Sequence, residues 1–171
     1  MLVFLFCAET CLLHFQWIKC HSTSLYINCG GGSLKIGNNE YQSDLEAGGA
    51  SYFYAVDSRW GFSNTGNFLD DGLRDSYIAQ ESCGISMNAS YLYNSARVSA
   101  LSLTYYAFCL LRGSYNVRLH FAEIIFTNDG TYSSLGRRVF DIYIQVSSRF
   151  SWINILSISR LIEFLGGGDE A

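Results

Sequence analysis

Charged residues are scarce in this sequence: they make up only 15% of the 171 residues, and the formal net charge is −4. An acidic chain of this kind has no basic surface to attract a phosphate backbone, so nucleic acid is not an expected partner. Proline is absent altogether, and nothing in the sequence accounts for its absence. Hydrophobic residues make up 49% and aromatic residues 16%, which indicates a folded chain rather than a disordered one. At this length we expect one domain with a single core.

Motifs that would indicate catalysis or metal binding are also missing. The six cysteines form no Cys-x-x-Cys pair and have no matching histidine spacing, so we expect no metal and no cofactor. No Gly-x-Ser-x-Gly segment marks a hydrolase nucleophile, and no spacing selects two carboxylates for a glycosidase. His120 and Glu123 lie three residues apart in a predicted strand, where their side chains point to opposite faces. We therefore expect no enzyme, and we interpret Asp44 and most other carboxylates as turn formers or solvated loop charges.

No apolar run is long enough to predict a transmembrane helix. Residues 150–165 are interrupted by Arg160 and Glu163, and they fall short of the ~20 residues that a bilayer requires. Residues 1–8 are apolar, like the core of a signal peptide, but they lack its positively charged start. We therefore treat residues 1–23 as a separate apolar segment, which is either signal-like or a leader from outside the domain.

Alternation of apolar and polar residues predicts strands along most of the chain. Residues 25–28 alternate and end at three successive glycines, and residues 115–124 and 140–146 show the clearest period of two. Helical periodicity is weak, so the predicted fold class is all-β, with an antiparallel β-sandwich as its architecture. The alternation predicts eight side chains that are buried together: Leu25, Ile27, Val117, Leu119, Phe121, Phe140, Ile142 and Ile144.

The secretory pathway is the favoured compartment. The triplet that begins at Asn88 is an N-glycosylation sequon, and the chain is rich in Asn, Ser, Gly and Tyr. Cys29 and Cys109 each follow a strand-like segment. They either form a disulfide or remain buried free thiols, and a single sequence does not decide between the two.

Five segments occur in an order and spacing that match a known family. They are LYINCGG (25–31), DLEAGGA (44–50), RVSALSLTYYAFCL (97–110), GSYNVRLHFAEI (113–124) and SSLGRRVFDI (133–142). The chain resembles, over residues 24–145, the malectin domain of plant leucine-rich-repeat receptor-like serine/threonine kinases. The resemblance implies a β-sandwich ectodomain, here without its kinase, at the cell surface or outside the cell. It also implies an oligosaccharide or a glycoprotein glycan as the ligand, and other receptor ectodomains as partners.

The family pattern stops near Gln145, and residues 146–171 depart from it. We expect this tail to pack loosely or to form a helix in place of the C-terminal strands of the sandwich. Two alternatives to a sugar-binding module stay open. One is a protein-interaction module of the same fold without sugar affinity, and the other is a truncated product without function.

Sugar binding requires aromatic rings that stack on the C–H faces of a pyranose, and carboxylates or amides that bond its hydroxyls. Animal malectin, which is similar in outline, lines its pocket with four aromatic residues and one aspartate. By resemblance, the four aromatic positions correspond here to Trp60, Val98, Ile125 and Phe126. The aspartate has no counterpart, so we expect weak binding. The candidate saccharide-binding residues, expected on Gly- and Asn-rich loops, are Tyr41, Tyr54, Trp60, Phe62 and Phe126.

Overall fold

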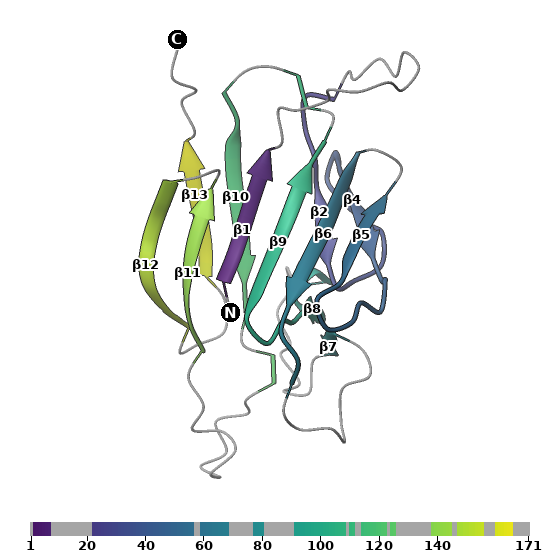
Figure 1. Ribbon diagram of the computed structural model, residues 1–171. Helices are drawn as coiled ribbons and strands as arrows, with labels where there is room; N and C mark the ends of the chain where they lie inside the picture. The colour runs from purple at the N-terminus through teal and green to yellow at the C-terminus, as the bar shows by residue number, and fades with distance from the viewer. Residues whose placement is uncertain are drawn as a thin grey trace, which may run out of the picture.

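The computed structural model confirms the all-β class. It describes residues 2–7, 22–56, 59–68, 77–80, 91–108, 110–111, 114–122, 124–125, 138–144, 147–155 and 160–165. Within these ranges the chain forms thirteen strands and a single 3-10 turn, η1 (Tyr91–Tyr93). The strands lie in two layers, as the sequence predicts for a sandwich (Figure 1).

The first layer is a six-stranded sheet. Its order is β12 (Ser147–Ile155), β11 (Arg138–Ile144), β1 (Leu2–Cys7), β9 (Ser102–Ala107), β6 (Trp60–Thr65) and β5 (Phe53–Val56). Strand β1 runs parallel to both of its neighbours, while the other pairs are antiparallel. The sheet is therefore mixed rather than purely antiparallel. The apolar residues 2–7 belong to the segment that was predicted to be either signal-like or a leader from outside the domain, and they form a strand in the interior of this sheet.

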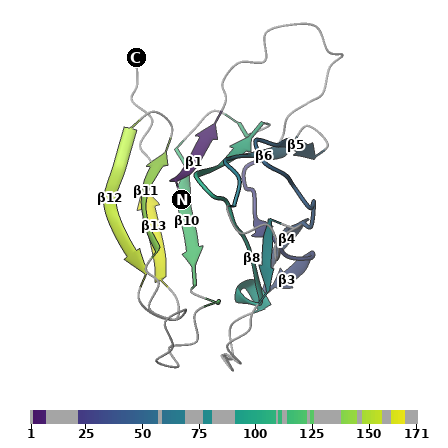
Figure 2. The ribbon, with the colours of Figure 1, turned by 60° about the horizontal axis from the view of Figure 1, so that its bottom comes forward.

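The second layer consists of three smaller sheets. They contain β2 (Ile27–Cys29) with β4 (Asn39–Asp44) and β3 (Leu34–Ile36), β10 (Asn116–Phe121) with β13 (Arg160–Leu165), and β7 (Ile78–Gln80) with β8 (Ser95–Arg97). Figure 1 looks onto the large sheet with β10, β13 and β2 behind it, and the rotated view in Figure 2 separates the two layers.

The sequence predicted a tail that packs loosely or forms a helix, whereas residues 147–155 and 160–165 form strands, so the helix is wrong for these residues. Strand β12 pairs antiparallel with β11, and β13 pairs antiparallel with β10. Phe150, Trp152 and Ile153 belong to residue types that favour strands. Pairing with β13 and β12 also covers one hydrogen-bonding edge each of β10 and β11. An edge that stays unpaired exposes backbone groups that can pair with another chain.

The core lies between the layers and is divided into clusters. Trp60, Phe62, Leu103 and Tyr105 form one cluster, against which Leu25, Ile27, Tyr52, Tyr54 and Val56 pack. Of the eight side chains predicted to share one core, only Phe140 and Ile142 are fully buried. Phe121 joins them across the layers, with its ring 5.1 Å from that of Phe140, but it remains partly exposed. The single-cluster prediction is wrong because Leu25 and Ile27 pack on Trp60 instead.

The three glycines after β2 make a tight turn, and we expect Gly30→Ala to destabilise the protein by roughly 1–3 kcal/mol. Gly30 has a φ of 79°, which an L side chain rarely adopts, and a Cβ there would lie 2.5 Å from the backbone of Ala96 and Arg97. Urea denaturation measures the loss. Gly32→Ala is the matched control, because a Cβ at Gly32 meets nothing within 4 Å. Equal stability of the two variants would contradict the prediction.

Candidate functional site

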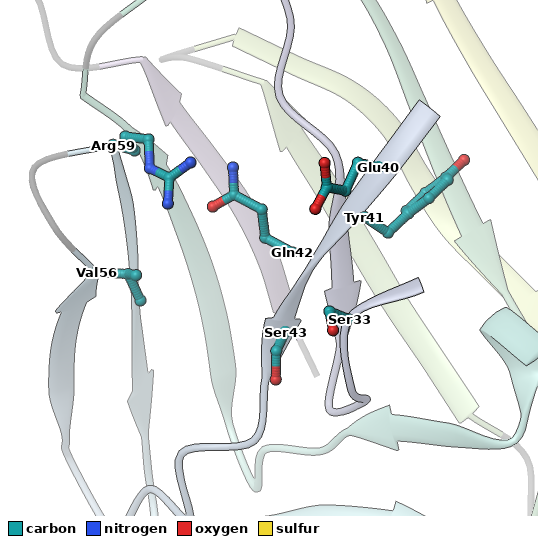
Figure 3. Close-up of a pocket in the computed structure, with 7 residues that line it drawn as sticks. All are labelled: Ser33, Glu40, Tyr41, Gln42, Ser43, Val56 and Arg59. Carbon is teal, nitrogen blue, oxygen red and sulfur yellow. The ribbon is translucent and has the colours of Figure 1, made fainter. Parts of the chain in front are cut away.

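A cavity of about 350 Å³ lies where β4 faces the turn between β5 and β6. Its lining is mostly polar and comes from both layers of the sandwich. The residues are Ser33, Glu40, Tyr41, Gln42, Ser43, Val56 and Arg59 (Figure 3). This volume lies at the lower end of the ~300–1,000 Å³ range of small-molecule sites.

Gln42 occupies the middle of the cavity. Its backbone N–H donates to the carbonyl of Tyr26 (2.9 Å), which ties β4 to the chain just before β2. Its side-chain Oε1 accepts a hydrogen bond from Nε1 of the buried Trp60 (2.8 Å). Because an indole N–H can only donate, the amide oxygen must face Trp60, and the amide nitrogen is left for the cavity. That nitrogen donates to no residue that the structure describes.

Arg59 and Glu40 lie on opposite sides of Gln42, and the guanidinium of Arg59 points toward the amide (Figure 3). The backbone of Arg59 is fixed: its N–H donates to the carbonyl of Val56 (3.0 Å), and its own carbonyl accepts from the N–H of Phe108 (2.9 Å). Neither Arg59 nor Glu40 forms an ion pair with a described residue. The cavity thus presents a carboxylate, an amide and a guanidinium that have no protein partner in this part of the chain.

Tyr41 also lines the cavity, and its ring extends away from Gln42 (Figure 3). The ring forms a tilted pair with that of Tyr26, with 5.3 Å between the centroids. Tyr93 lies nearby: burial raises the pKa of Tyr93, and Tyr41 adds to the increase. The hydroxyl of Tyr93 shares a hydrogen bond with Nδ1 of His120 (3.0 Å). An aromatic surface therefore adjoins the polar part of the cavity.

A buried ion pair anchors the end of β4. The Asp44 carboxylate accepts from Nε and Nη2 of Arg97, both at 2.7 Å, and neither side chain is exposed. Asp44 Oδ2 also accepts from the N–H of Gly30 (3.1 Å) and the hydroxyl of Tyr105 (2.6 Å). Burial raises the pKa of Tyr105 well above its usual value, so its hydroxyl stays a donor at neutral pH. Asp44 is therefore not the solvated loop charge that the sequence suggested.

Arg97 has further contacts that connect three strands of the structure. Its Nη2 donates to the carbonyls of Asp44 (3.1 Å) and Glu46 (2.6 Å), and its Cζ lies 3.9 Å above the ring centre of Phe62. Strands β4, β6 and β8 are thereby held together. This cluster positions β4 and with it the cavity, but all four Asp44 contacts are internal and leave no acceptor aimed at solvent.

The five aromatic candidates do not meet at one place. Trp60 and Phe62 lie on β6 rather than on a loop, and both are 0% exposed, so neither ring offers a face for a sugar. Tyr54 is partly buried on β5, with its ring 6.0 Å from that of Phe62. Tyr41 lines the cavity. Phe126 lies outside the described residues, and its role stays a prediction.

Of the described positions that correspond to the animal pocket, two lie together and one lies apart. Val98 is buried in an apolar cluster with Ala79 and Ile124, against which Ile125 packs, whereas Trp60 belongs to the other cluster. Asn88 and Cys109 lie outside the described residues. Cys29 forms no disulfide with a described residue, and its pairing with Cys109 stays a prediction.

Sequence reasoning did not identify Gln42, Arg59 or Glu40. The signal was the polar alternation of Glu40 and Gln42 on either side of Tyr41, which places both on one face of a strand. Arg59 gave no signal, because its approach to β4 depends on how the layers pack. Among the described residues, no cluster of His, Cys, Asp and Glu could hold a metal ion, and no helix is long and apolar enough to cross a membrane.

Comparison with known proteins gives one family and a consistent set of relatives. A family model described as the malectin domain matches residues 23–160, beyond the boundary at 145 predicted from the sequence. A probable LRR receptor-like serine/threonine-protein kinase of Arabidopsis thaliana is 50% identical over 147 residues, which are 82% of this chain and 14% of that protein. A second is 50% identical over 127 residues (73% and 12%), and a third, RFK1, is 45% identical over 145 residues (79% and 14%). No solved structure matches. The chain thus spans about one seventh of the length of these curated relatives.

Proposed function

Since this chain belongs to the malectin domain family, we propose that it is an extracellular recognition module, which binds a saccharide in the cavity around Gln42. The relatives are named as receptor-like kinases, and the region that they share with this chain is a small part of their length. The chain's role in this proposal is ligand recognition for such a receptor, on the outside of the cell, without catalysis. A glycan is the ligand, and other receptor ectodomains are the protein partners.

The observation that supports the proposal is the combination of groups in one cavity. The amide nitrogen of Gln42, the guanidinium of Arg59 and the carboxylate of Glu40 have no partner among the described residues, and together they can donate to and accept from sugar hydroxyls. The ring of Tyr41 extends from the cavity in the direction away from Gln42. One sugar unit occupies the polar part, and an adjoining unit lies on the tyrosine side.

We expect Tyr41→Ala to weaken the binding of an oligosaccharide roughly 3- to 10-fold, because an aromatic contact of this kind contributes about 0.5–1.5 kcal/mol. Binding of the corresponding monosaccharide changes less. Calorimetric titration with glucose disaccharides and cell-wall oligosaccharides measures both. Phe53→Ala is the control, since Phe53 is exposed on β5 but does not line the cavity. Unchanged affinity of Tyr41→Ala would remove Tyr41 from the site.

The second candidate function is a protein-interaction module of the same fold without sugar affinity. Several large apolar side chains are more than half exposed, namely Leu45, Phe53, Tyr91 and Leu101. Apolar side chains contribute to contacts with other proteins when they form a continuous patch. Absence of binding to every glycan in the titration would favour this function or a truncated product without function.

A further inference from the structure

The part of the cavity next to Arg59 contains the guanidinium of Arg59 and the side-chain amide of Gln42 (Figure 3). The Oε1 of Gln42 accepts a hydrogen bond from the N–H of Trp60, and the amide nitrogen remains as a donor. The guanidinium of Arg59 carries a positive charge and N–H donors, and it has no acceptor. A hydroxyl both donates and accepts, whereas an ionised carboxylate only accepts and is negatively charged. Arg59 therefore matches a carboxylate better than it matches a hydroxyl.

Among the described residues, no carboxylate neutralises the charge of Arg59. The other arginine described above, Arg97, is buried and neutralised by Asp44, while Arg59 is exposed and forms no ion pair with a described residue. Its backbone is fixed by two hydrogen bonds, to Val56 and from Phe108, so the side chain starts from a defined position. A guanidinium held in this way can form two parallel N–H···O bonds with one carboxylate.

The carboxylate of Glu40 lies on the far side of Gln42 from the guanidinium of Arg59, and no ion pair joins these two residues (Figure 3). Lys35 on β3 lies opposite Glu40 in the ladder, where opposite charges interact favourably even without a direct ion pair. Among the described residues, Arg59 and Glu40 are the charged residues that line the cavity, and Lys35 lies opposite Glu40 in the ladder. Two of these three side chains are positive and one is negative. This local excess stands out in a chain whose net charge is −4.

We infer, on the basis of the proposed saccharide site, that the cavity selects a saccharide bearing a carboxylate, such as a uronic acid unit, over its neutral counterpart. Arg59 forms a bidentate pair with the carboxylate, and the Gln42 amide nitrogen donates to the same group. Glu40, on the other side of Gln42, accepts from ring hydroxyls. Arg59 is then the residue that determines specificity, while the other lining residues contribute to both kinds of ligand.

The test compares a short oligouronide with its methyl ester, which has the same length and linkage but no charge. Titrated into the full 171-residue chain at low salt, the acid is expected to bind about 10-fold tighter or more, and added salt reduces the difference. Arg59→Gln weakens binding of the acid more than binding of the ester, and so removes the preference for the acid. Arg59→Lys keeps part of it, because the charge remains but the planar fork is lost. Lys35→Gln is the control and changes the preference less than about 3-fold.

The outcomes separate this inference from the proposed function. Equal binding of acid and ester overturns the inference and leaves the saccharide site standing. A preference for the acid that survives in Arg59→Gln also overturns it, because the carboxylate is then held elsewhere. Absence of binding by both probes and by neutral glycans overturns the proposed function together with the inference.

Discussion

Replacing Arg97 with methionine is expected to lower the free energy of unfolding by about 3–5 kcal/mol. The substitution leaves the carboxylate of Asp44 buried without its cation, and an uncompensated buried charge is among the most destabilising changes known for a single residue. It also removes the hydrogen bonds from Nη2 to two backbone carbonyls. Urea denaturation monitored by near-ultraviolet circular dichroism measures the loss.

Arg59→Met is the matched control for this experiment, since Arg59 is exposed and forms no ion pair with a described residue. Its replacement should change stability by no more than about 0.5 kcal/mol. A double-mutant cycle with Asp44→Asn tests the pair directly. The two substitutions together should cost less than the sum of the single losses, because they remove the same interaction. A loss below about 1 kcal/mol for Arg97→Met would show that the pair does not hold β4 in place.

Trp60→Ala is expected to cost about 3–5 kcal/mol, because it leaves a large cavity in the cluster that Trp60 forms with Phe62 and Tyr105. Trp60→Phe separates packing from hydrogen bonding. It keeps an aromatic ring but loses the N–H that bonds Gln42 Oε1, at a cost of about 1 kcal/mol from the bond itself. The side-chain amide of Gln42 is then free to rotate. Saccharide affinity should therefore fall several-fold while the domain stays folded.

The affinity of Trp60→Phe also has an internal control. In a Gln42→Met background the amide is already absent, so adding Trp60→Phe should not reduce affinity further. Full affinity in Trp60→Phe alone would show that the indole does not orient Gln42. Trp60, first considered as a ring that stacks on a sugar, would in the expected case act on the ligand only through Gln42.

The sequence predicted the class of the fold because period-two alternation is a local property. Residues 116–121 alternate and form β10 as expected. Asp44, by contrast, looked like a loop charge because its partner Arg97 is distant along the chain, and burial of a charge depends on that partner. The same holds for the interior position of β1, which is set by pairing with two remote strands.

Loop-like composition also concealed a buried strand. Gly61, Ser63 and Asn64 are typical of turns, yet they belong to β6. Gly61 is required there because a Cβ would lie 2.6 Å from the carbonyl oxygen of Tyr54 and 3.1 Å from the ring of Phe108. Asn64 accepts a hydrogen bond from the N–H of Tyr52 (3.0 Å). These residues serve close packing, which no local pattern of polarity predicts.

For the candidate site, the sequence identified one of the cavity residues, Tyr41, because aromatic rings in polar surroundings were the criterion. Gln42 and Glu40 alternate with Tyr41 on a short strand, which places them on one face, but this alternation alone does not separate a binding site from an ordinary solvated face. Arg59 reaches them from the β5–β6 turn of the other layer. A site assembled from two layers depends on tertiary packing, which one sequence does not give.

The interior position of β1 also has a kinetic consequence. Val3 is paired with Leu103 on one side and with Ile142 on the other, so every ladder of this strand joins residues that are far apart in the chain. Contacts between remote residues slow folding, because the entropy of closing a long loop is lost before the contact forms. Both edges of β1 are satisfied only when β9 and β11 have paired with it. The middle of the large sheet is therefore expected to form slowly.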